Sequence, residues 1–138
     1  VEAARDRVQA ALPADGDWVK AVRIEDLTPD HGHTVTLPNG ERVAVFRHGE
    51  SGEKISALSN VCAHQNGPLG EGKIVFGCVT CPWHGFQYDP ETGCSPPPFT
   101  EKVPTYRVRR EGEFVMIDTK ALPAGTPTPP IVLMEAMA

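Results

Sequence analysis

No run in this 138-residue sequence approaches the roughly 18 consecutive apolar residues needed to span a bilayer. The N-terminus also lacks the basic region followed by an apolar stretch that marks a secretory signal peptide. We therefore expect a cytoplasmic chain with no membrane contact in this segment. Because the sequence begins at Val1 rather than Met, this expectation leaves room for an upstream segment.

Positive charge is scarce, since 13 Lys and Arg residues stand against 18 Asp and Glu residues and the formal net charge is -5. A nucleic-acid-binding protein needs a basic patch for the phosphate backbone, so we expect no nucleic-acid partner. The hydrophobic fraction of 40% and the charged fraction of 22% are ordinary for a globular protein. At this length we expect one folded domain with short appendages.

The sequence divides into three parts. Residues 1–16 contain good helix formers followed by Pro13, which predicts a short N-terminal helix. Residues 17–118 alternate β-branched and aromatic runs with turn residues, as is typical of an all-β domain. The prolines within residues 119–138 predict an extended tail that cannot pair in a sheet, and we expect its apolar end, IVLMEAMA, to pack back onto the domain.

Short strands are predicted wherever a β-branched or aromatic run is bounded by turn residues. The Asn39-Gly40 pair favours a tight hairpin, and Glu111-Gly112 predicts a second turn. The expected strands are residues 34–37, 42–47, 54–59, 73–76, 86–88, 106–110 and 113–117.

Cysteine is rare, with four residues, which allows two disulfides, a metal site or a mixture. His64 follows Cys62 by two residues and His84 follows Cys81 by three, so each thiol is paired with an imidazole. This pairing favours a metal site. A zinc site would more often place like ligands together, in C-x2–4-C and H-x3–5-H arrangements, so a structural zinc module is the weaker alternative.

The remaining candidate ligands have simpler explanations. Cys78 and Cys81 form a C-x-x-C pair, but no βαβ pattern surrounds them, so Cys78 is expected to be a buried structural thiol. Cys94 is expected to be structural as well, and a disulfide between Cys78 and Cys94 is left open. His31, His33 and His48 lie in predicted turns, so we expect all three to be solvent-exposed loop residues.

The two ligand loops read VCAHQNGPLGEG and CPWHGFQYDPETG, and with this spacing the chain resembles the Rieske iron–sulfur family over residues 18–117. The resemblance implies a Rieske-like antiparallel β sandwich with a cluster-binding subdomain made by two loops. It also implies a [2Fe–2S] cluster, with Cys62 and Cys81 on the inner iron and His64 and His84 on the outer, more exposed iron.

The family pattern further implies that a third loop, residues 95–98, covers the cluster. Gly67, Gly70 and Gly85 have no side chain, which lets the backbone approach the sulfides closely. Replacing two thiolates by neutral imidazoles makes the oxidised cluster less negative, so Rieske potentials reach about -150 to +300 mV.

Three positions separate the branches of the family. Gly67 and Trp83 stand where high-potential members have a disulfide beside the cluster, and Phe86 stands where they have a serine hydroxyl. Tyr88 does fall at the position of their hydrogen-bonding tyrosine. The resemblance is therefore closer to the low-potential ferredoxins associated with oxygenases, and we expect a potential toward the -150 mV end of the range.

The expected function is one-electron transfer between a reductase and an oxidoreductase partner, both docking at His64 and His84. No catalytic residue is predicted, and whether the chain counts as an enzyme component is left open. The alternative is a Rieske subunit or fragment of a larger oxygenase, nitrite reductase or membrane redox protein. An oxygenase also needs a mononuclear iron on two His and one carboxylate, for which this chain has no room.

Overall fold

The computed structural model describes residues 16–63, 67–83 and 85–133, so the helix predicted before Pro13 lies outside the described residues. These residues form eleven short strands and two 3-10 turns, Ile24–Asp26 and Leu69–Glu71. Within the described ranges, no helix is long and apolar enough to cross a membrane. The all-β prediction is confirmed.

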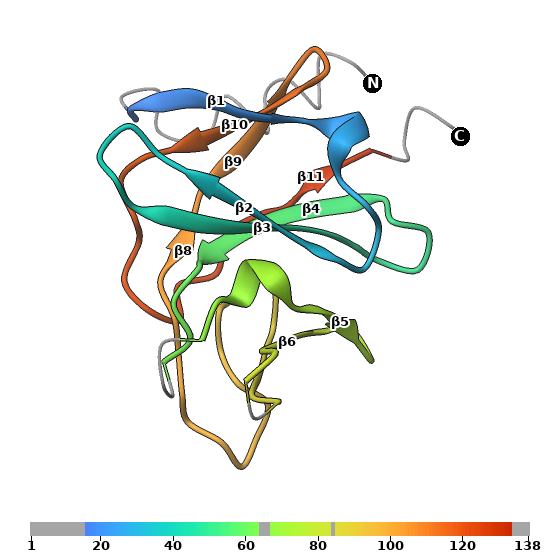
Figure 1. Cartoon of the computed structure of the whole chain (residues 1–138), viewed down its shortest axis with the longest axis vertical. Helices are drawn as coiled ribbons and strands as arrows, with labels where there is room; N and C mark the ends of the chain where they lie inside the picture. Colours follow the sequence, from blue (N-terminus) through green and yellow to red (C-terminus); the bar gives the residue numbers. More distant parts are fainter. Residues whose placement is uncertain (1–15, 64–66, 84, 134–138) are drawn as a thin grey trace.

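The first sheet is antiparallel, with the strands in the order β1 (Trp18–Arg23), β10 (Phe114–Asp118) and β9 (Val108–Glu111). It forms the upper layer in Figure 1. Side chains alternate between the two faces of a strand, so Val115 and Ile117 of β10 lie together in the core.

The second sheet crosses the middle of the molecule (Figure 1). Its order is β11 (Ile131–Val132), β4 (Lys54–Ser59), β3 (Arg42–His48) and β2 (Gly32–Thr36), and β8 (Thr105–Tyr106) also pairs with β4.

Strands β3 and β4 are buried on both faces because each face covers a different core. Val43 and Val45 of β3 belong to the core shared with the first sheet. Ala44 and Phe46 point the other way, into a second core that contains Cys62 and Cys81. The second core therefore joins the sandwich to the cluster loops.

The cluster-binding subdomain lies below the second sheet in Figure 1 and contains a third sheet. Its strands are β5 (Lys73–Val75), β6 (Cys78–Thr80) and β7 (Gln87–Tyr88), all antiparallel. The sequence did not predict β6, because a three-residue run between turn residues gives little periodicity.

The single strand predicted at residues 106–110 is wrong, since the chain changes sheets there. Tyr106 pairs with Ala57 of β4, whereas Val108 pairs with Ile117 of β10. Arg107 lies at the crossing, where its guanidinium forms an ion pair with the buried carboxylate of Asp118. The local sequence does not indicate that the chain changes sheets, because the residues on both sides of Arg107 are typical of strands.

The C-terminal segment is extended, but it does pair with the domain. Leu122 donates its N–H to the Thr105 carbonyl at 2.8 Å and forms a β-bridge with that residue. The prediction that this segment cannot pair was wrong because Leu122, unlike its proline neighbours, keeps a backbone donor. Ile131 then pairs with Ile55, so the described part of IVLMEAMA packs back as expected.

Candidate metal centre

The first cluster loop is anchored by Asn60, which follows directly after β4. Its buried side-chain oxygen accepts hydrogen bonds from the Gly70 N–H at 2.6 Å and the Thr34 hydroxyl at 3.3 Å. The Cys62 N–H donates to the Gly67 carbonyl at 2.9 Å, which joins the two sides of the loop. Asn60 was not among the predicted site residues, and its one sequence signal is its position as a polar residue directly after a predicted strand.

The second cluster loop connects β6 to β7. Cys81 donates its N–H to the Phe86 carbonyl at 2.8 Å, which closes the loop. The Trp83 N–H lies 3.4 Å from the Cys81 sulfur and donates to it. An N–H donor aimed at sulfur stabilises the thiolate form that a metal requires.

The two loops bring the Cys62 and Cys81 sulfurs together in the second core. Both residues are buried and neither forms a disulfide. Burial raises the pKa of the Cys81 thiol, the Trp83 N–H lowers it, and a hydrogen bond with Cys62 raises it again. Two adjacent buried thiols form a soft donor pair that suits iron, which must displace the thiol protons to bind.

Gly67 lies directly against the second cluster loop, and the predicted approach of the glycines to the cluster sulfides stays a prediction. A Cβ atom at this position would lie 2.6 Å from the Cys81 sulfur, so only glycine fits. At Gly70 the crowding comes from the Thr34 hydroxyl and Asn60 instead. A Cβ atom added at Gly85 would meet no atom within 4 Å. Gly85 has a φ of +72, a left-handed conformation that favours glycine.

Tyr88 provides the hydroxyl of the site, as the family pattern predicted. Its oxygen lies 3.1 Å from the Cys62 sulfur and accepts the Ala63 N–H at 3.1 Å. Burial raises the pKa of Tyr88, so the phenol stays protonated and can donate to a thiolate. Two buried sulfurs and an O–H donor directed at one of them fit the inner half of a [2Fe–2S] cluster.

The predicted outer ligands, His64 and His84, lie outside the described residues. The structure describes their neighbours Ala63, Trp83 and Gly85 on the two cluster loops. The assignment of both histidines as ligands therefore stays a prediction.

The proline-containing loop lies against the second cluster loop. The rings of Phe99 and Phe86 pack at a centroid distance of 6.2 Å. A cavity of about 140 Å³ opens between the two loops and is lined by Gly85, Phe86, Gln87, Ser95, Pro96 and Phe99.

Three large apolar side chains are exposed on the loops around the buried thiols. Val61, Trp83 and Phe99 are 47%, 49% and 60% exposed. Residues 60–70, 81–88 and 94–100 contain no Asp, Glu, Lys or Arg in a chain that is 22% charged. We call Val61, Trp83 and Phe99 the apolar rim.

The other cysteines and histidines are separate from this centre. Cys78 and Cys94 are free thiols, so the disulfide left open does not form, and Cys78 is half-buried rather than buried. His31 is exposed as predicted. His48 is not, because it ends β3 with its side chain in the interior and is only 4% exposed.

Three comparisons place this site among known proteins. A family model described as "Rieske [2Fe-2S] domain" matches residues 17–107. The chain is 31% identical over 104 residues to the ferredoxin component of the naphthalene 1,2-dioxygenase system of Pseudomonas putida, covering 73% of this chain and 94% of that protein. The solved ferredoxin of carbazole 1,9a-dioxygenase from Nocardioides aromaticivorans IC177 superimposes with a TM-score of 0.63 and 27% identity, covering 75% of this chain and 98% of that one.

A longer relative matches as well. The cholesterol 7-desaturase nvd 1 of Ciona intestinalis is 40% identical over 90 residues, which is 64% of this chain. The matched region spans only 18% of that desaturase.

Proposed function

Since the chain belongs to the Rieske [2Fe-2S] domain family, we propose that it passes single electrons as a ferredoxin between a reductase and an oxygenase. The observation that carries the proposal is the pair of buried free thiols, Cys62 and Cys81, with the Tyr88 hydroxyl against one of them. The relatives' ferredoxin components support the choice of partners. When bound, the cluster supplies a one-electron couple.

Different residues of the chain bind the cluster and stabilise its negative charge. Cys62 and Cys81 hold the inner iron, and we propose His64 and His84 as ligands of the outer iron. The Trp83 N–H and the Tyr88 hydroxyl are directed at the two sulfurs, so they stabilise negative charge there. Both sulfurs lie in an apolar core that excludes water from the inner side.

We propose the apolar rim as the docking surface for both redox partners. Val61 and Trp83 lie on the two cluster loops, and Phe99 lies on the proline-containing loop that packs against the second of them. Because the rim carries no charge, binding depends on apolar burial and shape rather than on attraction between opposite charges.

The alternative, a Rieske domain of a larger oxygenase, is favoured by one observation, the 40% identity to a much longer desaturase. The electron-transfer role of these residues is the same in that case. The partner would be a catalytic domain of the longer protein instead of a separate oxygenase.

The test is anaerobic reconstitution followed by iron and sulfide analysis, optical spectroscopy and reductive titration. We expect about two irons and two acid-labile sulfides per chain and uptake of one electron. A colourless protein that binds one zinc and no iron would refute the proposed function and support the structural zinc module.

A further inference from the structure

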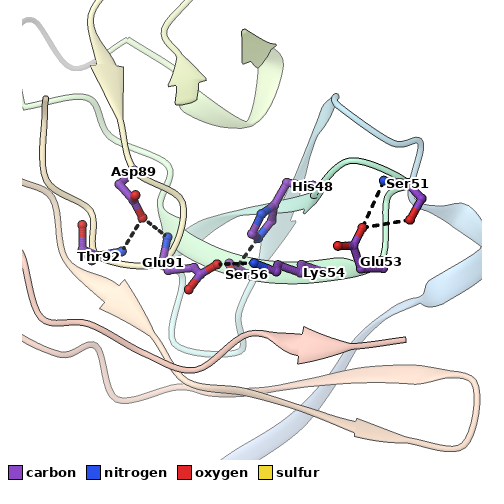
Figure 2. Close-up of polar contacts among 8 residues, drawn as sticks. All are labelled: His48, Ser51, Glu53, Lys54, Ser56, Asp89, Glu91 and Thr92. Atoms are coloured by element: carbon purple, nitrogen blue, oxygen red, sulfur yellow. Dashed lines mark hydrogen bonds and ion pairs between the residues drawn. The ribbon is translucent and has the colours of Figure 1, made fainter. Parts of the chain in front are cut away.

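His48 is a buried titratable group that the proposed electron-transfer site does not use. It is the last residue of β3 and shares a face with Phe46, two residues earlier, which belongs to the same core as Cys62 and Cys81. Its Nε2 atom lies 2.9 Å from the hydroxyl of Ser56 on β4 (Figure 2). The imidazole therefore lies at the edge of the core that contains the two cysteines.

Four charged side chains act on this imidazole from two sides. Lys54 begins β4, in the same sheet as His48, and Glu53 directly precedes it. Asp89 and Glu91 belong to the turn after β7, which lies beside β4 in Figure 2. The Lys54 ammonium reaches the Glu91 carboxylate at 3.5 Å, so the sheet and the turn are bridged beside His48.

The turn is tied directly to the metal centre. The Asp89 carboxylate accepts the N–H groups of Glu91 and Thr92 at 2.8 and 3.1 Å, which fixes the turn. Asp89 follows Tyr88, whose hydroxyl contacts the Cys62 sulfur. The carboxylates that face His48 are thus carried by the segment that positions Tyr88.

The charge state of His48 depends on a balance of these groups. Burial lowers the pKa of His48 below its ordinary value of about 6.5. The carboxylates of Glu91, Asp89 and Glu53 raise it, and Lys54 lowers it. The imidazole is therefore uncharged at neutral pH but has carboxylates in place to stabilise a proton.

We propose that His48 is a redox-linked proton site, which takes up a proton when an electron enters the domain. This inference rests on the proposed function. The reductase supplies the electron and solvent supplies the proton, so the interior gains no net charge. His48 is buried on the face of β3 that carries Phe46, a member of the core that contains Cys62 and Cys81, and inside a protein a charge is screened less than in water.

The sign of the effect follows from linkage. A positive charge on His48 favours the reduced, more negative domain, so the reduction potential is higher when His48 is protonated. The potential should therefore fall as pH rises through the pKa of folded His48. Reciprocally, reduction should raise the pKa of His48.

The test is the potential of the loaded protein between about pH 4.5 and 7.5, compared with His48→Gln, which cannot titrate. We expect a pH-dependent step in the parent protein and its loss in His48→Gln. His31→Gln changes an exposed histidine and should keep the step. An unchanged step in His48→Gln, or no step in the parent protein, would overturn the inference.

Glu91→Gln and Lys54→Gln separate electrostatic linkage from a purely structural role. Both variants break the same ion pair, so a structural role predicts shifts of the step in one direction. Linkage predicts opposite shifts, to lower pH in Glu91→Gln and to higher pH in Lys54→Gln. Shifts in the same direction would contradict the inference, and these variants decide the question even if His48→Gln does not fold.

Melting temperatures measured across the same pH range give a readout independent of electron transfer. The stability contributed by neutral His48 should be complete above about pH 6.5 and lost as the pH falls below it. If iron and sulfide analysis shows no cluster in the parent protein, the proposed function fails. If the cluster loads and reduces reversibly but the step is absent, only the role of His48 fails.

Discussion

The hydroxyl of Tyr88 lies 3.1 Å from the sulfur of Cys62, inside the apolar core that joins the sandwich to the cluster loops. Tyr88 comes from β7 and Cys62 from the loop after β4, so this contact ties the two cluster loops together. A buried O–H donor strengthens its hydrogen bond as negative charge accumulates on the sulfur.

Tyr88→Phe should lower the reduction potential on the order of 40 mV, because the reduced state loses more hydrogen-bond energy than the oxidised state. Tyr106→Phe is the matched control, since Tyr106 is also buried but belongs to the core between the first and second sheets. Protein-film voltammetry of both variants measures the shift. Equal potentials in Tyr88→Phe and the parent protein would show that the hydroxyl does not interact with the redox centre.

Cys62→Ser and Cys81→Ser should each abolish cluster binding, because each removes one of the two thiolates proposed to bind the inner iron. Cys78→Ser and Cys94→Ser should keep the cluster, since both residues are free thiols outside the pair of buried sulfurs. Iron and sulfide content per chain distinguishes these outcomes. Loss of iron in either control would mean that the ligands are misassigned.

Gly67→Ala and Gly85→Ala should have different effects on cluster binding. The added Cβ at Gly67 would lie 2.6 Å from the Cys81 sulfur, so we expect this variant to lose the cluster. The Cβ at Gly85 meets nothing within 4 Å, and its cost comes from the positive φ, about 1–2 kcal/mol of folding stability. Iron analysis and denaturant unfolding report the two effects separately, and full iron loading of Gly67→Ala would refute the steric argument.

Trp83→Ala and Phe99→Ala should slow electron exchange with the reductase by about tenfold each, the loss expected for a central apolar contact of roughly 1.4 kcal/mol. Phe76→Ala is the control, because Phe76 is 99% exposed but lies on the turn between β5 and β6. Stopped-flow reduction measures the rates. A loss in Phe76→Ala equal to that in Trp83→Ala would contradict docking at the apolar rim.

Because the apolar rim is uncharged, the rate of association with a redox partner should depend only weakly on salt. Raising the ionic strength from about 0.05 to 0.5 M should change the association rate less than threefold, since no charged residue lies in the three segments that carry the rim. A decrease of tenfold or more would show that charged residues elsewhere on the chain steer the partner.

Much of the centre could be predicted from the sequence because its signals are local. The spacing of Cys62 and Cys81 relative to the nearby histidines indicated the family, and the resemblance to that family singled out Tyr88. Short alternating runs between turn residues predicted most strands, including residues 54–59 with the observed bounds. These features depend on neighbours within a few positions in the chain.

Only the tertiary structure could decide contacts between distant segments. The sequence could not show that Gly67 packs on the Cys81 sulfur, that Arg107 marks a crossing between sheets, or that Leu122 pairs with Thr105. His48 was misjudged for the same reason. Its neighbour Gly49 indicated an exposed turn, but the imidazole is buried against Ser56 of β4. Two of the carboxylates that act on it, Asp89 and Glu91, come from a distant part of the chain. The identity of a residue sets its chemistry, whereas its burial, and hence its proton affinity, is set by whatever part of the chain folds over it.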